Sequence, residues 1–352
     1  MDNQKSKKKS PALFFIASFL AVIIIAVIAN RQSSLYKEIT IPLNNGILSL
    51  FTYDNFLAAV SFDNKTYLFD WNDLSKKYQT IPIKYDQMVL LKNGTIVSVS
   101  KYNAKSVAIT SIKDNTKPRE FALDTSENKT FLKIGKNRNE PILIIAKPKS
   151  NQTTLTFYTI DPNKDSPQYE FTIDSPIDIN QRIYAAVSDD ENLVSLCGGK
   201  GPPKAGWIAL CDLKEKKIAW ENQLPEPSLF FNCEFSPDSK LIYARGSDST
   251  VYKFDGNTGR LVGQFLPTKE NRSTIKNPHV QLVQVSSDGA LVAAVVSGVV
   301  CVWDTATGKK IFNETPGHKV MSDIVFSPDS KFLATSDSRQ GGKIKIWRIP
   351  AH

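Results

Sequence analysis

The side chains best suited to metal binding or proton transfer are few in this chain and far apart. They are three histidines and four cysteines, namely His279, His318 and His352, and Cys197, Cys211, Cys233 and Cys301. Catalytic and metal sites gather such groups in short motifs such as CxxC, HExxH, GxSxG or a phosphate-binding Walker loop, and the sequence contains none of these. A reaction centre would have to use scattered carboxylates. We therefore expect no catalytic residues, no cofactor and no metal, and hence a protein that is not an enzyme.

The spacing of the charged residues indicates how the chain is built. A charged residue closes an apolar run seven times, at Asp70, Asp114, Asp161, Asp212, Asp255, Asp304 and Arg348. The interval is about 43–51 residues, close to the ~40–45 residues of one β-propeller blade. Between these points, short runs rich in Val, Ile, Phe, Tyr and Thr are broken by turn-forming residues, as in all-β proteins. Repeats of this length bury their apolar faces only against neighbours. We predict an all-β, seven-bladed β-propeller, with six or eight blades as alternatives.

The two ends of this predicted propeller, residues 36–350, are expected to complete a single blade. The last unit contains only three strands, Met321–Phe326, Phe332–Ser336 and Lys343–Ile349. An open edge strand invites aggregation, so a propeller must close. The alternating segment at residues 36–43 has no blade of its own. We expect it to supply the missing outer strand of the last blade.

Two kinds of turn recur in the last third of the chain. The hexamer Phe-Ser-Pro-Asp-Ser-Lys occurs at residues 235–240 and again at 326–331. An Asp-x-x-Thr-Gly turn occurs at residues 255–259 and 304–308. Both are sequences of tight chain reversals. Together with Gly317-His318 and the run Lys343–Trp347, they make the chain resemble the WD-repeat β-propeller family, clearly over about residues 226–350 and weakly before that.

The resemblance implies a structural relay in the last blade and a function in protein binding. In that family a His, a Ser or Thr, an Asp and a Trp form a buried hydrogen-bond relay within a blade. The matching residues here are His318, Thr335 or Ser336, Asp337 and Trp347. On this interpretation His318 is a structural histidine rather than a ligand or a base. We expect a non-catalytic protein-interaction scaffold.

A second class of propeller remains as an alternative. The Asp-x-x-Thr-Gly turn also resembles the repeat of quinoprotein-type propellers, in which a Trp that follows the turn docks on the next blade. The matching positions here are Trp220, Gly263 and Phe312. One Trp in three argues against such docking, and the ring of charged ligands that a quinone needs is not evident. The alternative is therefore a membrane-tethered propeller enzyme or cofactor binder.

An apolar segment near the start predicts a transmembrane helix. Residues 11–29 contain one polar side chain, Ser18, and no charge. Nineteen helical residues span about 28 Å, which matches the ~30 Å hydrocarbon core of a bilayer. The preceding residues 1–10 are rich in lysine, which places the N-terminus in the cytoplasm and the propeller outside it, in the periplasm if the cell is bacterial. Residues 30–35 would form a linker. A cleaved signal peptide is the competing interpretation.

Export permits disulfide bonds, yet the cysteines are separated in the predicted blades. Cys197 and Cys211 would lie at opposite ends of one hairpin, and Cys233 and Cys301 fall in different blades. Four buried thiols that act as small apolar residues are the favoured interpretation.

Cationic residues in the long loops suggest where a partner binds. The candidate partner-binding residues are Lys200, Lys204, Lys269, Arg272, Lys276, His279 and Arg339. We expect them on one face, where they would accept an acidic protein segment or another anionic polymer; the competing interpretation is a solvated surface with ordinary lysines. The net charge of +9 over 352 residues is too small for the dense basic face of a nucleic-acid binder, so no nucleic acid is expected.

Overall fold

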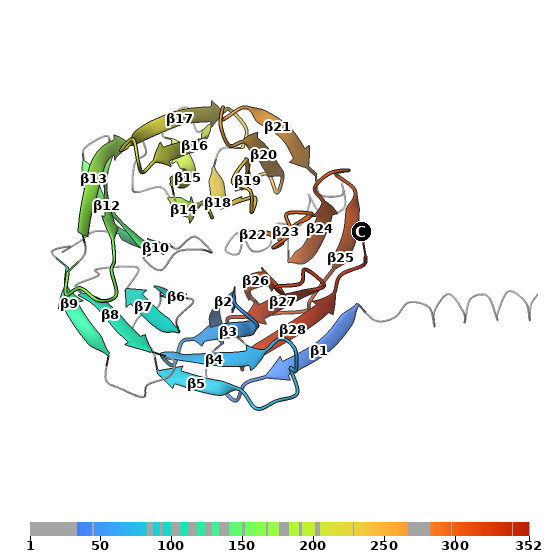
Figure 1. Cartoon of the computed structure of the whole chain (residues 1–352). Helices are drawn as coiled ribbons and strands as arrows, with labels where there is room; N and C mark the ends of the chain where they lie inside the picture. Colours follow the sequence, from blue (N-terminus) through green and yellow to red (C-terminus); the bar gives the residue numbers. More distant parts are fainter. Residues whose placement is uncertain are drawn as a thin grey trace, which may run out of the picture.

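A computed structural model of the chain describes residues 34–351, apart from 44–45, 83–86, 92–93, 100–105, 112–117, 124–128, 134–140, 150–151, 167, 176–182, 190–191, 201–204, 228, 267–281, 297 and 340. These residues form seven four-stranded antiparallel sheets, which are arranged around a ring as the blades of a β-propeller (Figure 1). The predicted all-β, seven-bladed fold is thereby confirmed.

The first four blades follow one another along the chain. Blade one consists of β2 (Ile47–Tyr53), β3 (Phe56–Ser61), β4 (Lys65–Asp70) and β5 (Gln79–Pro82). Blade two consists of β6 (Gln87–Leu90), β7 (Thr95–Val99), β8 (Ser106–Ser111) and β9 (Arg119–Ala122). Blade three consists of β10 (Lys129–Lys133), β11 (Ile142–Lys149), β12 (Gln152–Thr159) and β13 (Gln168–Ser175). Blade four consists of β14 (Tyr184–Val187), β15 (Leu193–Lys200), β16 (Ala205–Asp212) and β17 (Lys217–Leu224).

The last three blades include the one that joins the two ends. Blade five consists of β18 (Phe230–Phe235), β19 (Leu241–Gly246), β20 (Val251–Asp255) and β21 (Leu261–Phe265). Blade six consists of β22 (Val283–Val285), β23 (Leu291–Val296), β24 (Val299–Asp304) and β25 (Lys310–Glu314). Blade seven consists of β26 (Met321–Phe326), β27 (Phe332–Asp337), β28 (Lys343–Arg348) and, as its outer strand, β1 (Leu35–Thr40).

The pairing of β1 with β28 closes the ring. The two strands are antiparallel, from Leu35 opposite Trp347 to Thr40 opposite Lys343. The backbone N–H of Arg348 also donates to the carbonyl of Ser34 at 2.7 Å. The outer strand expected from residues 36–43 therefore starts at Leu35, a residue expected in the linker, and ends at Thr40, three residues before the expected end.

The core lies between the blades rather than within any one of them. Strands β23 and β24 in the sheet interiors are almost entirely buried, because both of their faces pack against side chains. The stacked rings of Phe157 and Phe171 in blade three, 4.6 Å apart, belong to one apolar cluster with Trp207 of blade four. Each sheet therefore depends on its neighbours to exclude water from its apolar side chains.

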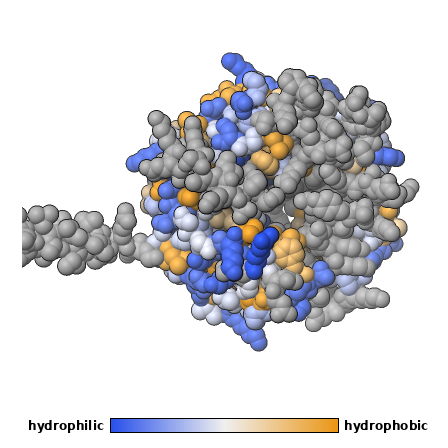
Figure 2. Space-filling model, turned by 180° about the vertical axis from the view of Figure 1, so that it is seen from behind, coloured by the Kyte–Doolittle hydropathy of each residue, from blue (hydrophilic) through white to orange (hydrophobic). Residues whose placement is uncertain are grey.

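The ring has two different faces. The first, here called the turn face, carries the hairpin turns at residues 236–240, 286–290 and 327–331 and the Asp-initiated turns at 256–260 and 305–309. The opposite face, here called the loop face, carries the connections between blades, such as residues 315–320, and those between second and third strands, such as 338–342. Hydrophobic residues are interspersed with hydrophilic ones on the side shown in Figure 2.

The expected membrane segment cannot be placed in this architecture. Residues 1–10, 11–29 and 30–33 lie outside the described residues. Among residues that are described, no helix has the length and apolar character that a membrane span needs.

Candidate functional site

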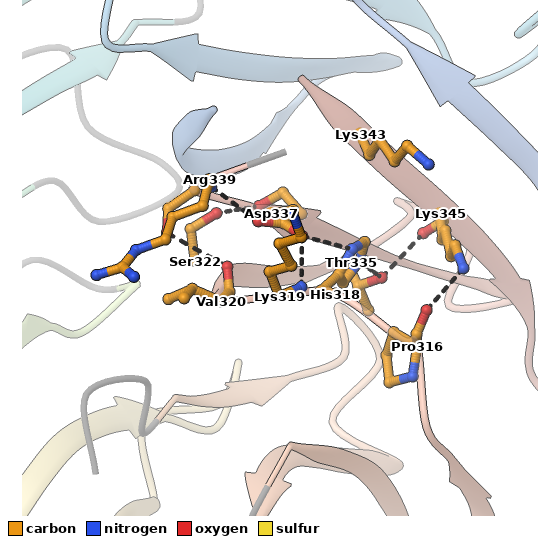
Figure 3. A network of polar contacts seen from close by, with 12 residues as sticks. Pro316, His318, Lys319, Val320, Ser322, Thr335, Asp337, Arg339, Lys343 and Lys345 are labelled. Carbon is orange, nitrogen blue, oxygen red and sulfur yellow. Dashed lines mark hydrogen bonds and ion pairs between the residues drawn. The ribbon is translucent and has the colours of Figure 1, made fainter. Parts of the chain in front are cut away.

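Two strands and one connection of blade seven bring the expected relay residues together. His318 lies in the connection that leads into β26, and Thr335 and Asp337 lie on β27 (Figure 3). Trp347 lies on β28. Thr335 and Asp337 are two residues apart on a strand, so their side chains project from the same side of the sheet. Thr335 and Asp337 are fully buried and Trp347 is 5% exposed.

The hydroxyl group of Thr335 is the centre of the relay. Its Oγ1 accepts a hydrogen bond from Nε1 of Trp347 at 3.1 Å and lies 2.8 Å from Nε2 of His318. An indole N–H only donates and the carboxylate of Asp337 only accepts, so the threonine proton points at the imidazole rather than at the carbonyl of Lys345, 3.4 Å away. Nε2 then accepts, and the ring proton sits on Nδ1, which faces Oδ2 of Asp337 at 3.7 Å. The order of donation is Trp347 to Thr335 to His318, and from there toward Asp337.

Burial keeps the imidazole of His318 neutral. Only 2% of its side chain is exposed, and loss of solvation lowers its pKa to about 4, despite the opposing effect of the Asp337 carboxylate. Both ring nitrogens are engaged by neighbours within the blade. The neutral imidazole therefore ties the connection before β26 to strand β27.

Asp337 also organises the loop face. Its Oδ2 accepts from the backbone N–H of Lys319 at 2.7 Å, and its Oδ1 accepts from the backbone N–H of Arg339 at 2.8 Å. One buried carboxylate therefore fixes the connection before β26 and the connection after β27. Lys319 and Arg339 are exposed there. Lys345, on the neighbouring strand, donates from Nζ to the carbonyl of Pro316 at 2.6 Å and holds the same connection.

Ser336, the other candidate for the hydroxyl position, has a different neighbour. It projects from the opposite side of β27 and its Oγ lies 2.7 Å from Oγ of Ser322 on β26. Thr335, and not Ser336, is therefore the residue in contact with His318 and Trp347.

Only two of the seven expected partner-binding residues lie in the part of the chain that the structure describes. Arg339 is exposed on the loop face, and Lys200 is the last residue of β15, which ends at the same face. The other five, Lys204, Lys269, Arg272, Lys276 and His279, lie outside the described residues.

The four cysteines are free and buried, as the sequence predicts. Burial raises the pKa of Cys211 to about 12 and that of Cys301 to about 11. Both thiols therefore stay protonated and unreactive at neutral pH. Within the described part of the chain, no three His, Cys, Asp or Glu side chains converge in a way that could hold a metal ion.

Contacts between blades at the outer rim were not anticipated from the sequence. Trp220 docks on blade five: its Nε1 donates to the carbonyl of Gly256 at 2.8 Å, and a Cβ atom added at Gly259 would lie 2.5 Å from the indole ring. The expectation that a single Trp argues against docking was therefore wrong at this junction. The signal was present, because Trp220 follows an Asp-initiated turn by the same interval as in the resembling quinoprotein repeat.

Other side chains take the same place at neighbouring junctions. Between blades five and six the position equivalent to Trp220 is Gly263, and Lys253 from the adjacent strand donates instead to the carbonyl of Thr305 at 3.3 Å. Between blades seven and one, Lys37 donates to the carbonyl of Leu74 at 2.6 Å. The common feature is a donor that satisfies a turn carbonyl of the next blade.

Arg245 is a buried cation that sequence reasoning also missed. It is 2% exposed, and its Nε donates to the carbonyl of Val295 in blade six at 3.2 Å. Its remaining donors reach Ser249 Oγ at 3.2 Å and the carbonyl of Gly246. Burial lowers its pKa to about 10, against the attraction of nearby Asp248. The guanidinium group therefore remains charged and links blades five and six.

Comparisons with known proteins agree with this geometry. The family model described as "WD domain, G-beta repeat" (WD40) matches residues 309–348, the stretch that contains the relay. Among solved structures, the β-propeller domain of Cps50 (Swd1) from Myceliophteria thermophila is similar, with a TM-score of 0.64 and 12% identity over 90% of this chain and 99% of that chain. No curated protein matches the sequence. The structural similarity, at that identity, concerns the fold alone. The chain is therefore a seven-bladed β-propeller in which residues 309–348, from the outer strand of blade six through three strands of blade seven, match the WD40 repeat.

Proposed function

We propose that this propeller is a non-catalytic protein-interaction scaffold, held at a membrane by residues 11–29 with the ring on the extracytoplasmic side. WD-repeat propellers typically act as platforms on which proteins assemble, and residues 309–348 match that repeat. Loops on a rigid scaffold commonly carry recognition. The partner-binding surface is then the loop face.

The observation that carries the proposal is the double role of Asp337. The carboxylate that belongs to the buried relay also fixes two surface connections by accepting from the backbone of Lys319 and of Arg339. A scaffold needs its recognition loops held in place before the partner arrives, since ordering them on binding would weaken the affinity. The relay therefore serves binding by holding these connections rigid.

The chemistry of the face favours an acidic protein partner. Among the described residues, Arg339 and Lys319 are exposed cations on this face, and Lys200 ends a strand there. The sequence leads us to expect Lys204, Lys269, Arg272, Lys276 and His279 on the same face. Opposite charges across an interface steer association and select the partner, and the attraction weakens as salt is added.

Charge reversal tests this function. Lys269, Arg272 and Lys276 are changed together to Glu in the full-length protein, which is then crosslinked in native membranes and its partners quantified by mass spectrometry. We expect the main partner to be lost. A matched triple reversal on the turn face, at Lys240, Lys309 and Lys331, should retain it. An unchanged set of partners in the loop-face variant contradicts the proposal.

The anchor is tested separately. The full-length chain should resist extraction from membranes by carbonate, and its mass should include residues 1–29. A mature protein that lacks those residues would show that the segment is a cleaved signal peptide.

A further inference from the structure

The point at which the chain enters the propeller is near one face. Strand β1 runs from the turn face to the loop face, because its first residue, Leu35, pairs with Trp347 at the end of β28. The first described residue, Ser34, contacts Arg348 at the outer rim, where the C-terminus also lies (Figure 1). Whatever precedes Ser34 is therefore attached at the turn-face end of blade seven.

The linker to the proposed anchor is short. Five residues, 30–34, separate the end of the apolar segment from β1. Even fully extended they reach roughly 18 Å, at 3.3–3.6 Å per residue. Strands of about six residues make the ring itself about 20 Å deep. The turn-face end of blade seven thus has to lie within about one ring depth of the bilayer.

The side chains at that end suit a lipid headgroup region. Tyr36 is 51% exposed, its ring centroid lies 4.8 Å from that of Phe332, and the guanidinium carbon of Arg348 lies 5.4 Å from the tyrosine centroid. Tyrosine is enriched where a membrane span meets water, since its ring is apolar and its hydroxyl is polar. Arginine places an apolar stem in the interface and a charge in water.

Exposed hydrophobic side chains are concentrated at the same end of the ring. Six large ones are exposed among the described residues, and four of them, Tyr36, Tyr169, Leu261 and Val262, lie where outer strands leave the turn face. They belong to blades three, five and seven, which are spread around the ring (Figure 1). The remaining two, Phe62 and Leu266, lie toward the loop face.

We propose that the turn face lies against the lipid bilayer, with Tyr36, Tyr169 and Val262 in the headgroup region, and that the loop face points away from it. The inference rests on the anchor proposed above and deepens the proposed function. It assigns the lipid surface to one face and the protein partner to the other. Lys319 and Arg339, whose backbone is held by the buried Asp337 carboxylate, are then presented on the side remote from the membrane.

Fluorescent labels on single introduced cysteines test this orientation. The native cysteines are at most 1% exposed, so they form a silent background for thiol labelling. Tyr36→Cys, Tyr169→Cys and Val262→Cys report on the turn face, and Phe62→Cys and Arg339→Cys report on the loop face. Each full-length variant carries an environment-sensitive dye and is placed in phosphatidylcholine–phosphatidylglycerol vesicles that contain a spin-labelled lipid as quencher.

We expect the spin-labelled lipid to quench the emission of the three turn-face labels. The emission of the two loop-face labels should stay unchanged. Phe62 is the matched control, because it is as apolar and exposed as the turn-face sites. Quenching at Tyr36 alone would mean that the ring stands on its edge, and quenching at Phe62 or Arg339 would mean that it is inverted; both outcomes overturn the proposal. If Tyr36→Cys unfolds the chain, Lys331→Cys, with 74% of its side chain exposed, replaces it. Release of the protein by carbonate, by contrast, refutes the anchor itself.

Discussion

One hydroxyl group, that of Thr335 on β27, connects polar groups of β28 and of the connection before β26 in blade seven. Its oxygen contacts Trp347, His318 and, at 3.4 Å, the carbonyl of Lys345. A buried polar group that loses its partner costs about 1–3 kcal/mol, so removing one member of the relay leaves the others unsatisfied. The relay residues should therefore respond to mutation as a unit.

The buried histidine makes stability depend on pH. The pKa of His318 is about 4 in the folded protein and near 6.5 in the unfolded chain. Below pH 6.5 the unfolded chain binds a proton that the folded protein does not, so stability falls as the pH drops from 6.5 to 4. At about 1.4 kcal/mol per pKa unit the loss is at most about 3 kcal/mol. Urea unfolding at several pH values between 4 and 7 measures it.

Two variants isolate the contribution of the imidazole from that of the many carboxylates. His318→Gln should be less stable than the parent at pH 7 but should lose less stability on acidification. Trp347→Phe, which keeps the histidine and removes one donor to Thr335, should retain the steeper dependence. The groups that face His318 also include Lys345 and Glu38, so both variants must be compared in the same salt. Identical slopes in parent and His318→Gln would contradict a neutral, buried imidazole.

Individual residues were predictable where one sequence motif contained the contact. His318, Asp337 and Trp347 follow from the pattern of one blade, and the choice between Thr335 and Ser336 depended on which side of β27 faces the histidine. Trp220 and Arg245 were missed for a different reason. Their partners, Gly256 and Val295, lie in the next blade, and the register between two blades is not encoded in the spacing within one.

Two otherwise equivalent turns differ in what covers them. Gly259 and Gly308 end the Asp-initiated turns of blades five and six, with φ values of +69° and +71°. An added Cβ would lie 2.5 Å from the indole of Trp220 at Gly259, whereas nothing lies within 4 Å at Gly308. Substitutions at these two glycines therefore distinguish the energetic cost of backbone strain from the cost of disturbing the contact between blades.

We expect Gly308→Ala to cost about 1–2 kcal/mol, because an L-residue is strained at this φ. Gly259→Ala should cost about 1–3 kcal/mol more, since the methyl group also displaces the docked indole. Denaturant unfolding of the two single variants measures the difference. Combining each with Trp220→Ala is the control: the excess cost at Gly259 should shrink and the cost at Gly308 should not. Equal costs for the two glycines would show that the docking contact contributes nothing.

Element boundaries followed from the sequence best in the last third of the chain. There, turn motifs mark where β18 to β28 begin and end. The bulges that follow the Asp-initiated turns were not predicted, yet they decide which outer-strand residue reaches the next blade. In blade four the register between β16 and β17 shifts between Leu210 and Cys211. As a result, Trp220 pairs with Leu210. A bulge adds one residue without a sequence signature of its own.

The whole ring depends on the strand that joins its ends. Ile41, just beyond β1, is fully buried in a cluster that contains residues of blades seven and one. Replacing residues 36–43 with a Gly/Ser linker of equal length removes this side chain and the pairing with β28, so we expect a loss of at least about 2 kcal/mol. Thermal unfolding measures it. The same linker in place of residues 267–274, between blades five and six, is the control and should cost less; equal losses would contradict a special role for closure.

At the scale of the molecule, the seven-fold repeat was predictable from the sequence. Each blade needs four short strands and their turns, and this requirement sets the length of the repeat. The positions of the exposed apolar side chains on the ring were not predictable, because they depend on which surfaces remain uncovered once the ring has closed. The exposed Tyr36, Tyr169 and Val262 follow from outer-strand geometry that no single repeat reveals.

The pairing of Leu35 with Trp347 also has a consequence for biosynthesis. The first strand is translated about 300 residues before the strand that it needs, which at 5–20 residues per second is roughly 15–60 s. Throughout that time the nascent β1 has an unsatisfied edge, and blade seven exists only as an incomplete sheet. Ribosomes that stall or terminate early therefore release chains that cannot close. Such chains display β1 as an unpaired strand that chaperones or proteases can recognise.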